Sequence, residues 1–208
     1  MKILKRMLSV LLIPMLTQTT FAADALAPKE WQVVRRESAI AFRARQAGAE
    51  FKGSFGLFAP RISFSPDNLA ASKAVVDITL SSVDTRSADR DENLKGKDWF
   101  DVARFPSARF ETTAFRKTGE KTYEADARLT IRDVALPVTL PFKLDIVKDS
   151  SGKETATMDG SVTLDRSKFN IGSGSWVDTG IIANEVPVDV HIVAVHRGAE
   201  KPMPAPSK

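Results

Sequence analysis

Residues 123–146 read YEADARLTIRDVALPVTLPFKLDI, and this stretch decides the fold class of the chain. Between Tyr123 and Ile131 apolar residues alternate with polar ones, which is typical of a β-strand with one dry and one wet face. From residue 134 to 146 apolar residues again hold one parity, while Pro137 and Pro141 stand on the other. Because proline cannot donate to a ladder, we expect this second strand to lie at an edge, to bulge or to be broken.

The same alternation recurs on both sides of this stretch, within residues 40–44, 51–57, 62–64, 76–80, 156–164 and 186–194. About eight strands in sequence-local antiparallel order, without a strong amphipathic helix, predict an all-β fold closed into an up-and-down barrel. An open sheet would leave exposed edges and an uncovered apolar face. A two-sheet sandwich is the structural alternative, because alternation alone does not separate the two.

Two long connections interrupt the strand pattern. Residues 81–110 carry no alternation, and compact domains rarely keep such long excursions without a use for them. Within them we expect a short helix over 88–95, with Ser87 as its N-cap and Gly96 as its stop. The second connection spans 166–180. Because Trp99 and Trp176 lie in these connections, we expect them either to plug the interior or to line the mouth of a cavity.

The first residues have the pattern of a secretory signal peptide. Three positive charges precede a short apolar run, and small residues follow it, which predicts cleavage after Ala22. Residues 1–22 hold three of the 30 lysines and arginines and none of the 26 acidic residues, so the remaining chain is nearly neutral at 27 against 26. We therefore expect no nucleic-acid partner, a single domain over 23–197 and a disordered tail over 198–208. The signal-peptide pattern predicts a periplasmic protein, with secretion beyond the periplasm as the alternative.

The sequence offers few candidate catalytic or metal-binding residues. The chain has no cysteine, which excludes disulfides, a thiol nucleophile and thiolate metal sites. His191 and His196 have an odd spacing, so one strand would place them on opposite faces. Residues 89–93 begin like a calcium loop but lack its glycine and glutamate at the sixth and twelfth positions. These observations favour a binding protein over an enzyme, with no metal site.

An ordered set of short motifs carries a family resemblance. The set consists of Ser82-Val83-Asp84-Thr85, Arg90-Asp91, Leu94, Trp99-Phe100-Asp101, Phe105-Pro106, Arg109-Phe110, Leu129-Thr130-Ile131, Pro137-Val138, Leu164-Asp165-Arg166, Phe169 and Ile171-Gly172. It resembles the signature of YceI-like proteins over about residues 31–195. The resemblance implies an exported lipocalin-like antiparallel β-barrel of about eight strands, with one short helix in a long inter-strand insert. It also implies a hydrophobic tunnel for polyisoprenoids such as quinone tails.

The resemblance also narrows the choice of partner. Residues 99–101 and 174–176 are similar to a subgroup associated with b-type membrane cytochromes, which implies such a cytochrome as a partner. The chain departs from many relatives at Asn93, where they carry histidine, and at Asp133, where they carry glycine. A histidine role at the polar end of the ligand therefore does not transfer to this chain.

The resulting hypothesis is a periplasmic carrier that holds an isoprenoid lipid, a quinone or polyprenyl chain, inside the barrel, with no other cofactor. The predicted ligand-binding residues are nine in the wall and four near the mouth: Ile40, Phe42, Val76, Ile78, Leu80, Leu129, Ile131, Leu140 and Phe142, and Trp99, Phe100, Phe110 and Trp176. One alternative is an interaction module with a filled barrel that docks on a b-type cytochrome. Another is a hydrolase or isomerase that uses Asp84, Asp89 or Asp91. The oligomeric state is left open, a dimer being one alternative.

Overall fold

The computed structural model describes residues 27–178 and 180–196. The predicted signal peptide (1–22), the predicted tail (198–208) and the outermost residues of the predicted domain lie outside these ranges. No helix within them combines the length and the apolarity that a membrane crossing requires.

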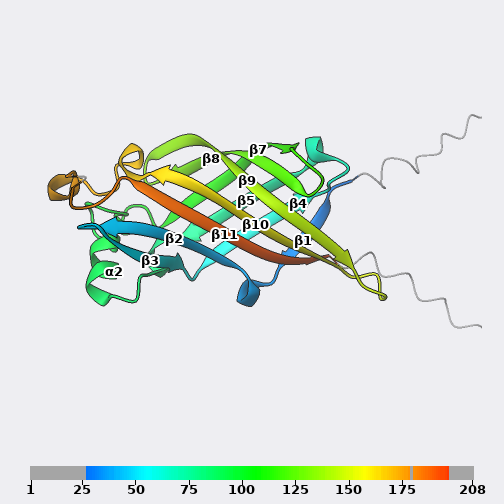
Figure 1. Cartoon of the computed structure of the whole chain (residues 1–208), viewed down its shortest axis with the longest axis horizontal. Coiled ribbons are helices and arrows are strands. Elements are labelled where there is room, and N and C mark those ends of the chain that lie inside the picture. The colour runs from blue at the N-terminus through cyan, green and yellow to red at the C-terminus, as the bar shows by residue number, and fades with distance from the viewer. Residues whose placement is uncertain (1–26, 179, 197–208) are drawn as a thin grey trace, which may run out of the picture.

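In the described part of the chain, eleven strands form a single antiparallel sheet that closes on itself. The barrel is elongated, with helix α2 (Ala88–Lys95) near one end and the β9–β10 turn at the other (Figure 1). The strands are β1 (Lys29–Val33), β2 (Ala39–Gln46), β3 (Ala49–Phe55), β4 (Phe58–Phe64), β5 (Lys73–Thr79), β6 (Val83–Asp84), β7 (Ser107–Lys117), β8 (Thr122–Ile131), β9 (Val134–Lys148), β10 (Glu154–Asp165) and β11 (Glu185–His196).

Three pairs of short strands act as three long interrupted strands. β1 and β2 run along the same neighbour, β11, on either side of the 3₁₀ turn η1 (Arg35–Glu37). In the same way, β4 pairs with β1 and β3 pairs with β2. On the next side, β5 pairs with β4 and β6 pairs with β3. The barrel wall therefore has eight strand positions, and the pairing of β1 with β11 closes it. The predicted eight-stranded barrel is confirmed, and the sandwich alternative is wrong.

β9 pairs with its two neighbours along different parts of its length. Its ladder with β8 covers Val134 to Lys143, whereas its ladder with β10 begins only at Phe142, opposite Gly160. β10 itself stays paired with β11 along its whole length. Residues 134–141 of β9 and 161–165 of β10 therefore face one another without a ladder, and we call this gap in the pairing the open seam.

The two prolines of β9 belong to this seam. Pro137 and Pro141 pair with β8 but fall outside the ladder with β10, which confirms the expectation of an irregular edge. Since proline has no amide hydrogen, neither residue can donate to a strand placed alongside.

The connection between β6 and β7 contains α2, the only α-helix in the described ranges. Its predicted bounds are confirmed, and the amide of Gly96 bonds to Asn93 O at its end. Ser87 stands at the predicted N-cap position, but its side chain makes no capping bond. Instead, the carboxylate of Asp91 accepts hydrogen bonds from the amide and the hydroxyl of Thr85 at 2.8 and 2.7 Å. A carboxylate inside the first turn thus fixes the chain that enters the helix.

Candidate functional site

The inward-facing residues of the barrel wall enclose a cavity of about 270 Å³. Its lining consists of aliphatic and aromatic side chains together with Thr112 and Arg166. Alternation along each strand produces this lining, because successive side chains point to opposite faces of the sheet. A barrel of this size has room for one small ligand or for part of a long chain.

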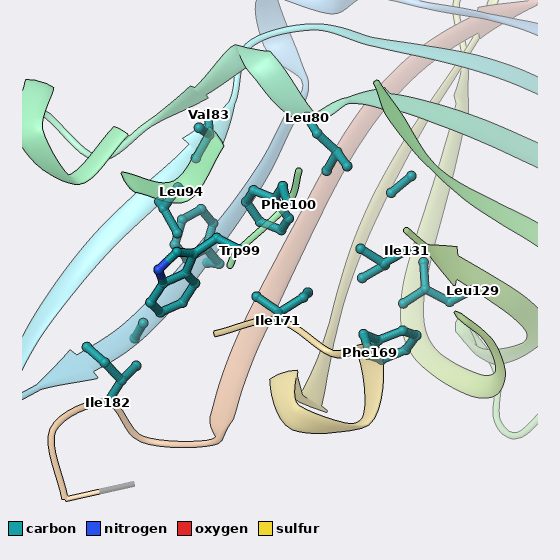
Figure 2. Close-up of a cluster of buried hydrophobic side chains, with 13 residues drawn as sticks. Leu80, Val83, Leu94, Trp99, Phe100, Leu129, Ile131, Phe169, Ile171 and Ile182 are labelled. Atoms are coloured by element: carbon teal, nitrogen blue, oxygen red, sulfur yellow. The ribbon is translucent and has the colours of Figure 1, made fainter. Parts of the chain in front are cut away.

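Two clusters of buried side chains surround the cavity. One contains Trp31, Phe64, Tyr123 and Phe142; within it Phe64 meets Tyr123 edge-on, at 5.9 Å between ring centroids. The other lies beneath the long insert and includes Trp99 and residues of both connections (Figure 2). The cavity is therefore bounded by aromatic rings, which cover large apolar areas with few rotatable bonds.

Two segments cover the second cluster, and hydrogen bonds join them. The first cover segment is residues 96–106 and the second is residues 166–178. The backbone oxygen of Asp98 accepts bonds from the amides of Gly172 and Ser173, both at 2.8 Å. The rings of Trp99 and Trp176 lie 5.6 Å apart across the same junction. The two connections thus form one continuous cover.

Arg132, in the turn between β8 and β9, bonds to both cover segments. Its Nη1 donates to Trp99 O at 3.0 Å and also to Asn170 O. The backbone of Arg132 is left-handed, with φ of 56°, which an extended strand could not provide. The strained turn therefore directs this guanidinium at the junction of the two covers.

Arg166 holds the second cover segment from inside. It is only 4% exposed, and burial lowers the pKa of its guanidinium from the ordinary value. All five of its N–H donors bond to main-chain oxygens, at 2.8–3.2 Å. The acceptors are the carbonyls of Ile171, Gly172, Trp176, Ile182 and Ala183. A single side chain thus fixes the path of a segment that has little regular structure.

Arg90 connects α2 to the barrel wall through a contact with an aromatic ring. Its guanidinium lies 4.0 Å from the centre of the Phe51 ring on β3, a cation–π contact. Arg104 forms its ion pair with Asp101, inside the same insert.

Trp99 carries a polar atom without a partner. The residue is 8% exposed and lines the cavity, and its indole Nε1 is buried with no acceptor among the described residues. By contrast, the Nε1 of Trp31 donates to Phe64 O at 3.0 Å. A buried donor left unpaired costs about 1–3 kcal/mol, so an acceptor that reached this indole N–H would stabilise the protein.

The structure gathers most of the predicted ligand-binding residues around this cavity. Its lining includes Ile40, Phe42, Val76, Ile78, Leu80, Trp99, Phe100, Phe110, Leu129, Ile131, Leu140 and Phe142. Trp176 is the exception, since it is absent from the lining and packs against Trp99. Contact of these residues with a ligand remains a prediction.

Sequence reasoning missed several lining residues. Some share the parity of the predicted ones and could have been found, such as Leu144 on β9 and Phe51 on β3. Others, namely Arg166, Phe169 and Ile171, come from the second connection, where no alternation marks an inward face.

The acidic and histidine candidates lie apart from the cavity. Asp84 accepts a bond from the amide of Arg86, Asp89 is exposed, and Asp91 is engaged by Thr85. None of the three belongs to the cavity lining. In residues 27–178 and 180–196, no group of three or more histidine, aspartate or glutamate side chains is placed to hold a metal ion.

The sequence of this chain is similar to that of known proteins. A family model described as the YceI-like domain matches residues 31–194. The chain is 35% identical over 176 residues to a UPF0312 protein of Yersinia pestis, covering 84% of this chain and 87% of that one.

Solved structures share the fold. The crystal structure of Burkholderia cenocepacia BcnA superposes with a TM-score of 0.71 at 31% identity, over 78% of this chain and 99% of that one. A polyisoprenoid binding domain from Saccharophagus degradans superposes with a TM-score of 0.62 at 15% identity, over 81% of this chain and 99% of that one. At that identity the likeness concerns the fold alone.

Proposed function

The chain belongs to the YceI-like family, and from this premise we propose that it is a periplasmic binding or carrier protein for an isoprenoid lipid. The observation that carries the proposal is the closed barrel around an apolar cavity of about 270 Å³. The described Saccharophagus degradans domain, a polyisoprenoid binding domain of the same fold, supports this ligand class. The periplasmic location is supported by the signal-peptide pattern of residues 1–22.

Burial of the hydrocarbon chain would supply most of the affinity. Each buried CH₂-sized group contributes about 0.8 kcal/mol, so ten carbons contribute about 8 kcal/mol gross, comparable to micromolar binding before ordering costs. No particular polar contact is needed for affinity of this order. Polar groups would instead decide which lipid is preferred.

A quinone or another isoprenoid with an oxygen at one end fits the cavity better than a pure hydrocarbon. The unpaired indole donor of Trp99 supports this finer proposal, because an oxygen acceptor would satisfy it. Since Trp99 belongs to the covered end, the oxygenated end of the ligand would lie there and the chain would extend toward Tyr123 and Phe142.

Catalysis and cytochrome docking receive less support. No histidine, aspartate or glutamate appears in the described cavity lining, so a reaction inside the barrel would lack an acid or base from these residues. The docking alternative assumes a barrel filled by side chains, and the cavity counts against that assumption.

The proposal is tested by solvent extraction of the purified protein and mass spectrometry of the extract, followed by reconstitution with an isoprenoid quinone. Ala125 is 3% exposed and lines the cavity, so Ala125→Phe places a ring inside it. We expect this variant to keep the fold by circular dichroism and to lose the lipid. Ala135→Phe, on the exposed face of β9, is the matched control and should bind normally. A wild-type protein that yields no lipid and takes up no added quinone would refute the proposal.

A further inference from the structure

We propose that the lipid chain enters and leaves the barrel sideways, through the open seam between residues 134–141 of β9 and 161–165 of β10. This inference rests on the proposed function, since it describes the route of the same ligand. It follows from strand pairing, from the lining of the cavity and from the way the covered end is fastened.

The seam leads directly to the cavity. Val138 and Leu140 from one edge and Val162 and Leu164 from the other all belong to the cavity lining. The five residues 161–165 span about 16 Å at the usual rise of a strand. An apolar chain that passed between these edges would meet aliphatic side chains on the inner face of both strands.

The inward side chains of β9 become less buried beyond the point where its ladder with β10 ends. In the paired part, the inward residues Phe142 and Leu144 are buried. Leu140, next to the last pair, is also buried, whereas Leu136 and Val138 further along are only half-buried. The inward side chains at 136 and 138 are therefore less buried than those at 140, 142 and 144.

The sequence keeps the seam from closing into a ladder. If the register of Phe142 with Gly160 continued, Pro141 would face Ser161 and Pro137 would face Asp165. Neither proline has an amide hydrogen to donate, so a continued ladder would lack bonds at these positions. Because β9 and β10 are not paired along the seam, the two strands can move apart there without the loss of ladder hydrogen bonds.

The covered end is a more costly route. Separation of the two cover segments there would break the bonds of Gly172 and Ser173 to Asp98 O and those of Arg132 to both segments. Each such bond contributes about 0.5–1.5 kcal/mol net, and more when one partner is charged. No ladder bond has to break along the described seam, so this comparison favours the sideways route.

Cross-linking separates the two routes, because the chain has no cysteine of its own. Thr139 and Thr163 are exposed and face one another if the β9–β10 register is extended, so the variant T139C/T163C can be bridged across the seam by a short cleavable bis-maleimide. The variant D98C/S173C is bridged across the cover instead and keeps the main-chain bonds of Asp98. The variant T130C/A135C joins ladder partners on β8 and β9 and is the matched control.

Stopped-flow quenching of tryptophan fluorescence by a short-chain isoprenoid quinone gives the entry rate, and displacement gives the exit rate. We expect the seam cross-link to slow both rates by about tenfold or more, which corresponds to about 1.4 kcal/mol in the barrier. The equilibrium affinity should stay the same, and cleavage of the linker should restore the rates. The cover and control cross-links should leave both rates unchanged.

Slow exchange with the cover cross-link, combined with normal exchange with the seam cross-link, would overturn the sideways route. If the wild-type protein shows no quenching at any quinone concentration, the proposed function itself fails, and this inference with it. The two failures are thus told apart by the wild-type control.

Discussion

The ring of Phe42 packs so closely onto its cross-strand partner Gly53 that a Cβ atom built there would lie 2.3 Å from Cζ of the ring. The ring also contacts Phe55, with centroids 5.7 Å apart, and lines the cavity. The missing side chain at Gly53 therefore provides the space in which an aromatic residue of the wall lies.

Replacement of that glycine should disturb both stability and the cavity. In Gly53→Ala the new methyl group would push the Phe42 ring inward, and overpacking of this kind costs about 1–3 kcal/mol. We expect a lower urea midpoint and weaker quinone uptake. Gly56→Ala is the control, because its added Cβ would lie 3.8 Å from the nearest atom, Ser82 O. Equal midpoints for the two variants would contradict this account of Gly53.

Removal of the Arg166 side chain should release the second cover segment. Arg166→Met leaves five main-chain oxygens without their donor, and we expect a loss of about 2–5 kcal/mol in the free energy of unfolding. Hydrogen exchange should rise most in residues 171–178. Arg104→Met is the control, since the side chain of Arg104 is 70% exposed and its ion pair contributes about 0–1 kcal/mol. Unchanged exchange in the segment would contradict this role of Arg166.

Loss of the indole N–H of Trp99 should reduce discrimination between lipids more than affinity as such. We expect Trp99→Phe to weaken binding of an isoprenoid quinone about 3- to 10-fold relative to a hydrocarbon of equal chain length. In the wild type, the ¹⁵N indole resonance of Trp99 should shift downfield when quinone binds. Trp31→Phe is the control, because that indole already donates to Phe64 O. Equal losses for quinone and hydrocarbon would exclude a bond to the ligand.

The acid sensitivity of the barrel should depend on Asp77. Hydrogen bonds from Arg61 and then Arg109 hold the pKa of this carboxyl below its ordinary value of 3.8. A pKa depressed in the folded state stabilises the fold fully above 3.8, and this stabilisation is lost as the pH falls through the lowered value. The arginines lie on β4 and β7, on either side of Asp77, so the triad links three strands.

Urea unfolding of wild type and Asp77→Asn at pH 7 and pH 2.5 measures this contribution. The variant should be less stable at pH 7, and the difference should shrink at pH 2.5. Asp67→Asn is the control, because Asp67 is exposed and forms no ion pair with any described residue. A stability difference between wild type and Asp77→Asn that is the same at both pH values would rule out the titration of Asp77 as its origin.

The walls of the barrel were predictable because their information is local. Leu129 and Ile131 alternate with Thr130, and a strand converts that order directly into an inner and an outer face. The insert helix was predictable for the same reason, through its acidic first turn and Gly96.

The cover and the seam depend on contacts between residues distant in sequence. Arg166 stands beside Asp165, which in sequence suggests a surface pair, yet its acceptors are carbonyls placed by the left-handed backbones of Asn170 and Gly172. Pro137 and Pro141 pointed to an irregular edge, but only the three-dimensional pairing shows that β10 is the missing partner. Trp176 illustrates the same limit, because an aromatic residue in a loop can pack against another cover residue instead of the cavity.

Closure of the barrel by β1 and β11 has a consequence for folding kinetics. Gln32 pairs with Val195 and Val33 with Ala194, so the ladder that completes the barrel joins the first described strand to the last. Contacts of such high sequence separation place a protein among slow folders, with times of about milliseconds to seconds. A chain in which residues 185–196 have not yet joined the sheet cannot complete this ladder, so the apolar interior stays accessible until they do.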